Sequence, residues 1–368
     1  MRLNSEHCAL SIVLQFGVSK HSLGIRIQGA EMDYVNLGKH GVKVSRLCLG
    51  TMMFGGATDE TESIRIIHRA MDEGINFIDT ANVYNAGESE RVLGKALKGR
   101  RDQAVVVTKV INPMGEGPNN QGASRFHILT EVENSLRRLD TDHIDLYILH
   151  KPDYSTPLEE SLRTLDDLVR QGKVRYIGMS NYYAWQICQA LWLSDVKSLA
   201  SVACIQPVYN LVHRDAEVEL LPFCHEHGIG VMIYSPLARG VLAGKYLAGQ
   251  PLPEGSRAQR GDTRIQQTEL KEESFEVAQK LKPMADAQGK TLTQFSLNWA
   301  LTNRIITSAI VGPRTMKHLE DNLGGLGWDI DQNSLYEIDT LVPPGTHTGI
   351  GFTDPAYPVR GRIVNDLT

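Results

Sequence analysis

The sequence predicts one closed (β/α)8 barrel, and two observations favour it. Short apolar runs, each about 4–8 residues long, alternate with stretches of helical length along most of the chain. The runs are apolar almost throughout, which is typical of parallel strands that are buried on both faces. A parallel sheet in which each strand is followed by a helix closes most simply into a barrel.

The expected strands number eight and cover residues 46–51, 75–80, 104–109, 143–150, 174–181, 201–207, 229–236 and 305–312. Apolar residues recur with a helical period between them, most plainly in residues 60–74, 125–139 and 157–173. In the segment after the fifth strand, Trp185 and Trp192 share one helix face and are predicted to be core residues. An open, doubly wound sheet is the alternative fold, but no GxGxxG motif follows the first strand.

Several segments lie outside this repeat. A hairpin is predicted around Lys39-His40-Gly41, ahead of the first barrel strand. A long insertion with Gly and Arg residues, 237–270, follows the seventh strand, and loops of this length are usually lids or disordered. The tail, 343–368, is rich in Pro and Gly and is expected to drape over a barrel face.

We therefore expect a barrel domain at residues 32–342, followed by the tail at 343–368. Residues 1–31 contain a short apolar run but no clear signal-peptide pattern. They are expected to be a disordered extension, or to precede the native start at Met32.

Composition and charge exclude several functional classes. The net charge is −5 and both signs are dispersed along the chain, so no nucleic-acid or membrane-surface patch is indicated. No apolar run reaches the ~18–20 residues of a membrane-spanning helix. Five cysteines without CxxC spacing indicate reduced thiols, and hence a cytoplasmic protein. The sequence does not indicate the oligomeric state.

Four polar side chains lie at, or just past, the ends of expected strands: Asp79, Tyr84, Lys109 and His150. Catalytic groups gather at the carboxyl ends of the strands in βα barrels. These residue types suit proton transfer. Tyr84 is the expected acid, Lys109 lowers its pKa, Asp79 keeps Lys109 charged, and His150 polarises a carbonyl group.

Two other interpretations of these residues remain open. Asp79 and Lys109, taken alone, are about as consistent with a structural ion pair as with catalysis. Asp79, Glu88 and His150 are also possible metal ligands. The neighbouring cation of Lys109 argues against a metal, because metal ligation favours a shell without a positive charge.

The chain resembles the aldo-keto reductase superfamily from about residue 32 to about residue 326. The resemblance rests on seven motifs that occur in the family's order: INFIDTANVYNAGESE, VVVTK, DLYILHKPD, GKVRYIGMSN, IQPVYN, IYSPLARGVLAGKY and IVGPRTMKHLEDN. It implies NADPH-dependent reduction of an aldehyde or ketone to an alcohol. In that reaction Tyr84 is the general acid, Asp79 and Lys109 tune it, and His150 binds the carbonyl oxygen.

The resemblance also implies the binding residues. The expected cofactor contacts are Gly50, Thr51, Asp79, Ser180, Asn181, Gln206, Tyr234, Ser235, Pro236, Leu237, Arg239, Gly240, Lys245, Gly312, Arg314, His318, Asp321 and Asn322. A flat aromatic ring such as that of Tyr234 suits a nicotinamide, and the guanidinium of Arg314 suits a ribose 2′-phosphate, which favours NADPH over NADH. Met53 and Phe54, with Tyr84 and His150, are expected to line the substrate pocket.

A second hypothesis is a regulatory module that binds NADPH and senses it. Potassium-channel β-subunits share the resemblance and the same four residues. Such a role calls for an assembly face or a long inactivation segment, and residues 1–31 are short for that. For the enzyme, the expected partner is a small carbonyl compound, which the sequence does not identify further.

Overall fold

The computed structural model describes residues 32–349, 354, 356 and 357, and it confirms the closed barrel. Predictions for residues 1–31 lie outside the described residues. All neighbouring barrel strands are parallel, in the order β10-β3-β4-β5-β6-β7-β8-β9. The strands are β3 (Leu47–Gly50), β4 (Phe77–Asp79), β5 (Val105–Val110), β6 (Ile144–Leu149), β7 (Val174–Ser180), β8 (Val202–Gln206), β9 (Gly230–Ile233) and β10 (Ser308–Val311).

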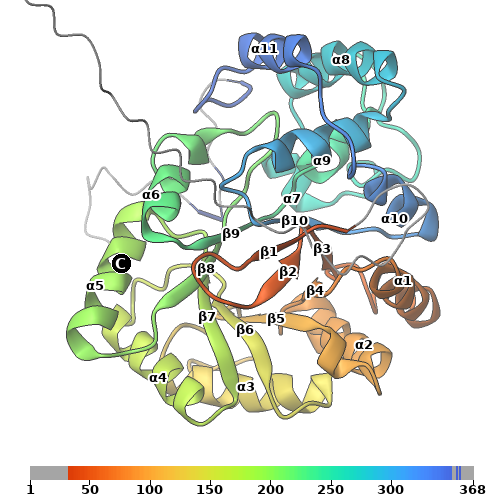
Figure 1. Cartoon of the computed structure of the whole chain (residues 1–368). Coiled ribbons are helices and arrows are strands. Elements are labelled where there is room, and N and C mark those ends of the chain that lie inside the picture. Colours follow the sequence, from red (N-terminus) through yellow and green to blue (C-terminus); the bar gives the residue numbers. More distant parts are fainter. Residues whose placement is uncertain (1–31, 350–353, 355, 358–368) are drawn as a thin grey trace, which may run out of the picture.

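Helices surround this ring of strands (Figure 1). They are α1 (Glu60–Asp72), α2 (Glu88–Leu97), α3 (Arg125–Leu139), α4 (Leu158–Arg170), α5 (Ala184–Lys197), α6 (Leu220–His227), α7 (Thr263–Gln267), α8 (Glu272–Ala287), α9 (Leu292–Thr302), α10 (Met316–Leu323) and α11 (Gln332–Leu341). Short 3-10 turns are η1 (Tyr84–Gly87), η2 (Arg101–Gln103), η3 (Asp215–Glu217) and η4 (Ala238–Ala243). None of the helices within the described ranges has the length and apolar character that a membrane span requires.

The predicted hairpin closes the amino end of the barrel. Its strands, β1 (Tyr34–Asn36) and β2 (Lys43–Ser45), are antiparallel and lie across the ring of strands in the view of Figure 1. Leu37 and Val44 pack there on side chains from inside the barrel. The backbone approach is so close that a Cβ on Gly38, whose φ is 58°, would lie 2.4 Å from the carbonyl oxygen of Gly228. The carboxyl end is therefore the end that is left for a site.

The insertion and the described part of the tail both lie on the barrel, and the insertion is not wholly irregular. The insertion after β9 contains η4 and the short helix α7. After α11, the tail crosses the loop that follows β8. The amide of Thr348 donates to the carbonyl of Val212 over 3.0 Å, and the amide of Arg214 donates to that of Thr346 over 2.8 Å.

The core prediction for Trp185 and Trp192 is wrong. These side chains are 59% and 60% exposed on the outer face of α5. The opposite face of the helix carries Ile187, Ala190 and Leu193, and this face packs on the barrel. Residues seven apart do share a helix face, but α5 is apolar on both sides, so the sequence pattern did not identify the buried one.

Candidate active site

A cavity of about 370 Å³ lies at the carboxyl end of the barrel. Of the predicted cofactor contacts, all but Thr51 line it: Gly50, Asp79, Ser180, Asn181, Gln206, Tyr234, Ser235, Pro236, Leu237, Arg239, Gly240, Lys245, Gly312, Arg314, His318, Asp321 and Asn322. Tyr84, His150 and Met53 also line it. Residues that are far apart in the sequence thus meet at one place, although their individual roles remain predictions.

Three of the four predicted catalytic residues are joined by hydrogen bonds. Lys109 is fully buried in β5, and its ammonium lies 2.7 Å from Oδ2 of Asp79, the last residue of β4. The same ammonium donates to the Tyr84 hydroxyl over 3.2 Å and to the Thr80 carbonyl over 2.7 Å. Gln206 donates to the other Asp79 oxygen over 2.9 Å. Lys109 thus joins the carboxylate to the phenol.

Burial and charge act in opposite directions on these groups. Burial raises the pKa of Tyr84 above its ordinary value, and it outweighs the lowering effect of Lys109 that the sequence predicts. Burial disfavours the charge of Lys109, but Asp79 and Tyr84 more than offset this, so the pKa of Lys109 lies above its ordinary value. Burial also raises the pKa of Asp79, while Lys109 acts against that rise. Tyr84 is therefore a protonated phenol at neutral pH, beside a charged lysine.

His150 follows β6 directly and lies beside Tyr84. The two rings meet edge to face, with centroids 5.9 Å apart. Asn112 donates its amide N–H to Nδ1 of His150 over 3.0 Å, which leaves the imidazole proton on Nε2. Burial, then the charges of Lys109 and Lys151, lowers the pKa of His150 well below its ordinary value. His150 is thus a neutral donor through Nε2.

Asn112 is a site residue that the sequence analysis missed. It lies two residues past the end of β5 and three after Lys109, and this position is the only signal that the sequence offered for it.

Left-handed backbone conformations gather around the site. Asn85 and Ala86, the residues after Tyr84, have φ values of 49° and 54°. Asn85 donates to the carbonyls of Met52 and Phe54 over 3.1 and 2.8 Å, which ties the turn that carries Tyr84 to the loop after β3. Asn181, Ser235, Ala238 and Arg239 share this unfavourable backbone region. Such conformations persist where the surroundings fix them, commonly at functional sites.

The nicotinamide residues predicted from the resemblance are bonded to each other and to the site. The Tyr234 hydroxyl donates to Oδ1 of Asn181 over 2.8 Å, and Nδ2 of Asn181 donates to the His150 carbonyl over 2.9 Å. The Ser180 hydroxyl donates to the Gln206 carbonyl over 2.8 Å. These contacts fix the side chains before any ligand binds.

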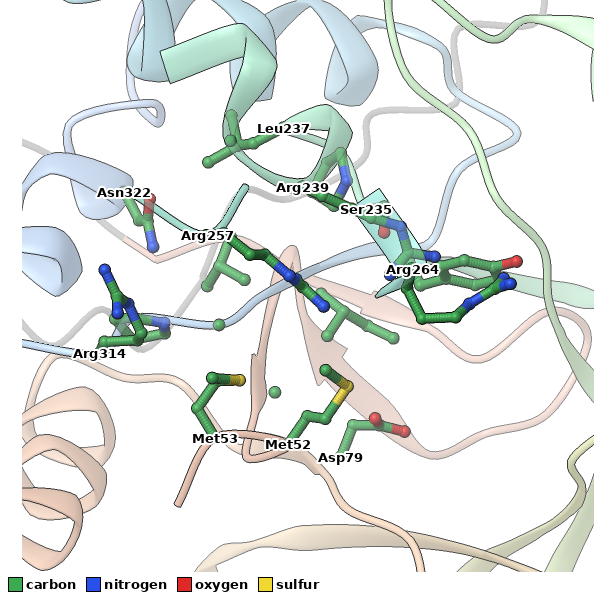
Figure 2. A pocket seen from close by; sticks show the side chains of 18 of the residues that line it. Met52, Met53, Asp79, Ser235, Leu237, Arg239, Arg257, Arg264, Arg314 and Asn322 are labelled. Atoms are coloured by element: carbon green, nitrogen blue, oxygen red, sulfur yellow. The ribbon is translucent and has the colours of Figure 1, made fainter. Parts of the chain in front are cut away.

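The far end of the cavity is strongly basic. Arg257 and Arg260, from the insertion, line it together with Lys245, Arg314 and His318. Figure 2 shows Arg257 extending into the cavity, with Arg314 and Asn322 to one side and Arg264 to the other. Burial, then Arg314, Arg260 and Arg257, lowers the pKa of Lys245, which reflects the crowding of like charges. This end is suited to an anion.

Arg257 has unused donor capacity. Its Nε lies 2.9 Å from Asp262, but its Nη2 is buried without a hydrogen-bond partner among the described residues. A buried donor left without a partner is costly, so the atom fits a ligand oxygen. Arg257 and Arg260 were not predicted from the sequence, because nothing in the insertion's composition reveals which of its arginines turn inward.

Two predicted site residues do not line the cavity. Thr51 is buried, and its hydroxyl donates to the Asp79 carbonyl over 3.0 Å. Phe54 is 1% exposed and packs in the core, whereas its neighbours Met52 and Met53 line the cavity. The loop after β3 turns there, so consecutive side chains point in different directions. Among the described residues, no group of three His, Cys, Asp or Glu side chains is arranged to hold a metal ion.

Comparison with known proteins defines the class of this barrel. Residues 46–343 match the Aldo/keto reductase family, and the chain belongs to that family. It is 38% identical over 329 residues to the uncharacterized oxidoreductase YrpG of Bacillus subtilis, a match that covers 86% of this chain and 98% of that protein. It is 34% identical over 338 residues to the aldo-keto reductase YhdN of the same bacterium, covering 90% of this chain and all of that one (100%).

A relative of another kind is a probable voltage-gated potassium channel subunit beta of Arabidopsis thaliana. The identity is 38% over 298 residues, covering 79% of this chain and 90% of the relative. Family membership, together with the two bacterial relatives, supports an oxidoreductase that acts as a carbonyl reductase.

Proposed function

We propose that this protein reduces an aldehyde or ketone to an alcohol with NADPH, and that Tyr84 donates the proton. The observation that carries the proposal is the phenol of Tyr84, 3.2 Å from the buried ammonium of Lys109 and edge to face with His150. Neither a structural ion pair nor packing accounts for a phenol and a neutral imidazole that both line one cavity.

The charge states of Lys109, Asp79 and His150 suit them to different roles in the reaction. Lys109 donates to the Tyr84 oxygen, so it stabilises the phenolate that remains when the proton leaves. Asp79 keeps Lys109 charged and in place. His150 presents Nε2–H as a neutral donor to the carbonyl oxygen, where negative charge develops. NADPH, when bound, supplies the hydride that the carbonyl carbon accepts.

The side chains of the cavity fit NADPH. At the basic end, the unpartnered Nη2 of Arg257 lies beside further cations, which suits phosphate oxygens. The guanidinium of Arg314 carries paired N–H donors that suit the ribose 2′-phosphate, a group that NADH lacks. At the other end, Tyr234 offers a ring for the nicotinamide, and Asn181 and Gln206 carry amides that match a carboxamide.

We also propose a cytoplasmic location, supported by the free thiols of Cys48, Cys188, Cys204 and Cys224.

A second candidate function is an NADPH-binding regulatory module. The similarity to the Arabidopsis channel subunit supports it, because that match covers most of both chains. The two candidates differ in turnover. A sensor binds NADPH tightly and reduces carbonyls negligibly, while a reductase turns over.

The deciding experiment measures NADPH oxidation by the purified protein on a panel of aldehydes and ketones, with NADH in parallel. We expect turnover with NADPH to exceed turnover with NADH at equal concentration, because the basic end has donors for one more phosphate. Tight NADPH binding without turnover on any carbonyl would instead support the regulatory module. Absence of NADPH binding would exclude both.

A further inference from the structure

An ion pair between Arg264 and Asp354 joins the tail to the insertion beside the cavity. Arg264, on α7, donates from both terminal nitrogens to the two carboxylate oxygens of Asp354, over 2.7 and 2.5 Å. The Arg264 side chain is 29% exposed and that of Asp354 is 14% exposed. A paired contact of this kind, sheltered from water, is among the stronger ion pairs that proteins make. Asp354 therefore neutralises a cation that lines the cavity.

Asp354 also shapes the chain that follows it. Its carboxylate accepts from the Ala356 amide over 2.9 Å, and its carbonyl accepts from the Tyr357 amide over 2.8 Å. This turn brings Tyr357 to the cavity wall, where its ring centroid lies 5.8 Å from the Arg264 guanidinium carbon. Asp354 thus both neutralises the charge of Arg264 and positions the ring of Tyr357.

The Tyr357 ring is close to the reacting groups. It lines the same cavity as Tyr84 and His150. Burial, foremost, and the nearby Asp354 and Tyr84 raise the pKa of Tyr357, with Arg264 acting against them. Met52, 38% exposed, adds a thioether to this part of the cavity. Together these side chains form a largely uncharged wall beside the place where a carbonyl group would bind.

Charge at this end is balanced. Arg239, the other arginine nearby, lies 2.9 Å from Glu269. A carboxylate or phosphate on a substrate would have to displace Asp354 from Arg264 and would meet repulsion from it. An uncharged flat group loses nothing there, and it gains contact with the Tyr357 ring.

We propose that Asp354 and Tyr357 determine the substrate class: carbonyl compounds with an uncharged, preferably aromatic substituent are accepted, and those that carry a carboxylate or phosphate are rejected. The inference rests on the reductase function proposed above and narrows it. Asp354 acts through Arg264 and is a specificity-determining residue.

The first test compares benzaldehyde with 4-carboxybenzaldehyde, which differ by one carboxylate. We expect the wild type to prefer benzaldehyde in kcat/KM. The Asp354→Asn variant keeps an oxygen for the turn but releases the Arg264 charge. It should shift the ratio toward 4-carboxybenzaldehyde by about tenfold, the lower limit for a hydrogen bond to a charged group. The ratio is used because a general loss of activity cancels from it.

Arg264→Met is the matched control. It removes the cation that Asp354→Asn exposes, so the double variant should lose the shift toward 4-carboxybenzaldehyde. An equal shift in the double variant would mean that Arg264 is not the group responsible, and the inference would fail.

The second test concerns the ring. Tyr357→Ala should lower kcat/KM for benzaldehyde about tenfold more than for methylglyoxal, which has no ring to pack, an effect in the range for one lost apolar contact. Tyr357→Phe keeps the ring and should keep the ratio.

The outcomes separate the two levels of the proposal. Turnover of methylglyoxal with NADPH, but unchanged ratios in both Asp354→Asn and Tyr357→Ala, overturns this inference and leaves the reductase intact. A wild type that prefers 4-carboxybenzaldehyde overturns it as well. Absence of NADPH-dependent turnover on every carbonyl overturns the reductase, and this inference with it.

Discussion

The two ends of the cavity differ in whether their positively charged side chains form ion pairs. At the end that holds Tyr84, three cations form ion pairs: Lys109 with Asp79, Arg264 with Asp354 and Arg239 with Glu269. At the other end, only Arg257 is paired, with Asp262, and Arg260, Arg314 and Lys245 form no ion pair within the part of the chain that the structure describes.

This difference separates groups that serve the chemistry from groups that await a ligand. Like charges crowded together repel one another, so a bound anion stabilises such a cluster of unpaired cations. A cation that already forms an ion pair needs no ligand. Such a pair can hold a proton donor in place and shift its pKa. Charge balance thus predicts which end binds phosphates and which end performs proton transfer.

The largest effect is expected at the end that holds Tyr84. Tyr84→Phe removes the proton donor but keeps the ring, so kcat should fall about 10²–10⁴-fold. The dissociation constant of NADPH, measured by fluorescence titration, should change little, since the phosphate end is untouched. A variant with near-normal kcat would show that another group supplies the proton.

A smaller effect is expected at the other end. Arg257→Met removes a buried donor, and the NADPH dissociation constant should rise about 10–100-fold, as for the loss of a hydrogen bond to a charged group. NADH should be affected less if Arg257 contacts the 2′-phosphate. The control is Arg264→Met, because both terminal nitrogens of Arg264 are bonded to Asp354. Arg257 also lies against a carboxylate, that of Asp262, but only through Nε, and its Nη2 has no partner among the described residues. If both variants weaken NADPH binding equally, the unpartnered donor of Arg257 does not mark the phosphate end.

The sequence predicted the barrel and its strands because both depend on local pattern. All eight strands were found within a few residues, and helix α3 was bounded correctly at Arg125 and Leu139. Strand ends then locate side chains without further knowledge. This is why the sequence alone predicts that Asp79, Lys109 and His150 lie at one end of the barrel.

Other parts of the site depend on chain paths that no local pattern determines. Arg257 and Arg264 belong to the insertion, and Tyr357 to the tail, and their inward direction follows from long-range contacts such as the Arg264–Asp354 pair. Phe54 illustrates the same limit, because the turn after β3 buries it and leaves Met53 on the cavity wall. The rise in the pKa of Tyr84 was not predictable either, because the burial that causes it is a property of the folded chain.

The smallest effect is expected at Asn112, whose hydrogen bond to Nδ1 leaves the proton of the neutral His150 ring on Nε2. Asn112→Asp places a carboxylate against Nδ1. An adjacent negative charge favours the protonated imidazole, so the pKa of His150 should rise from its lowered value toward the range about pH 5–8. In the wild type the pKa of His150 lies well below its ordinary value, so kcat/KM should not depend on this group, whereas the variant should show a new titration. Asn112→Leu removes the hydrogen bond without adding charge, so kcat/KM should fall only about fivefold, in keeping with about 1 kcal/mol for one neutral hydrogen bond, and the profile should stay flat. Superimposable pH profiles for the two variants would mean that a charge at position 112 does not reach His150, and that burial, Lys109 and Lys151 alone determine the pKa of His150.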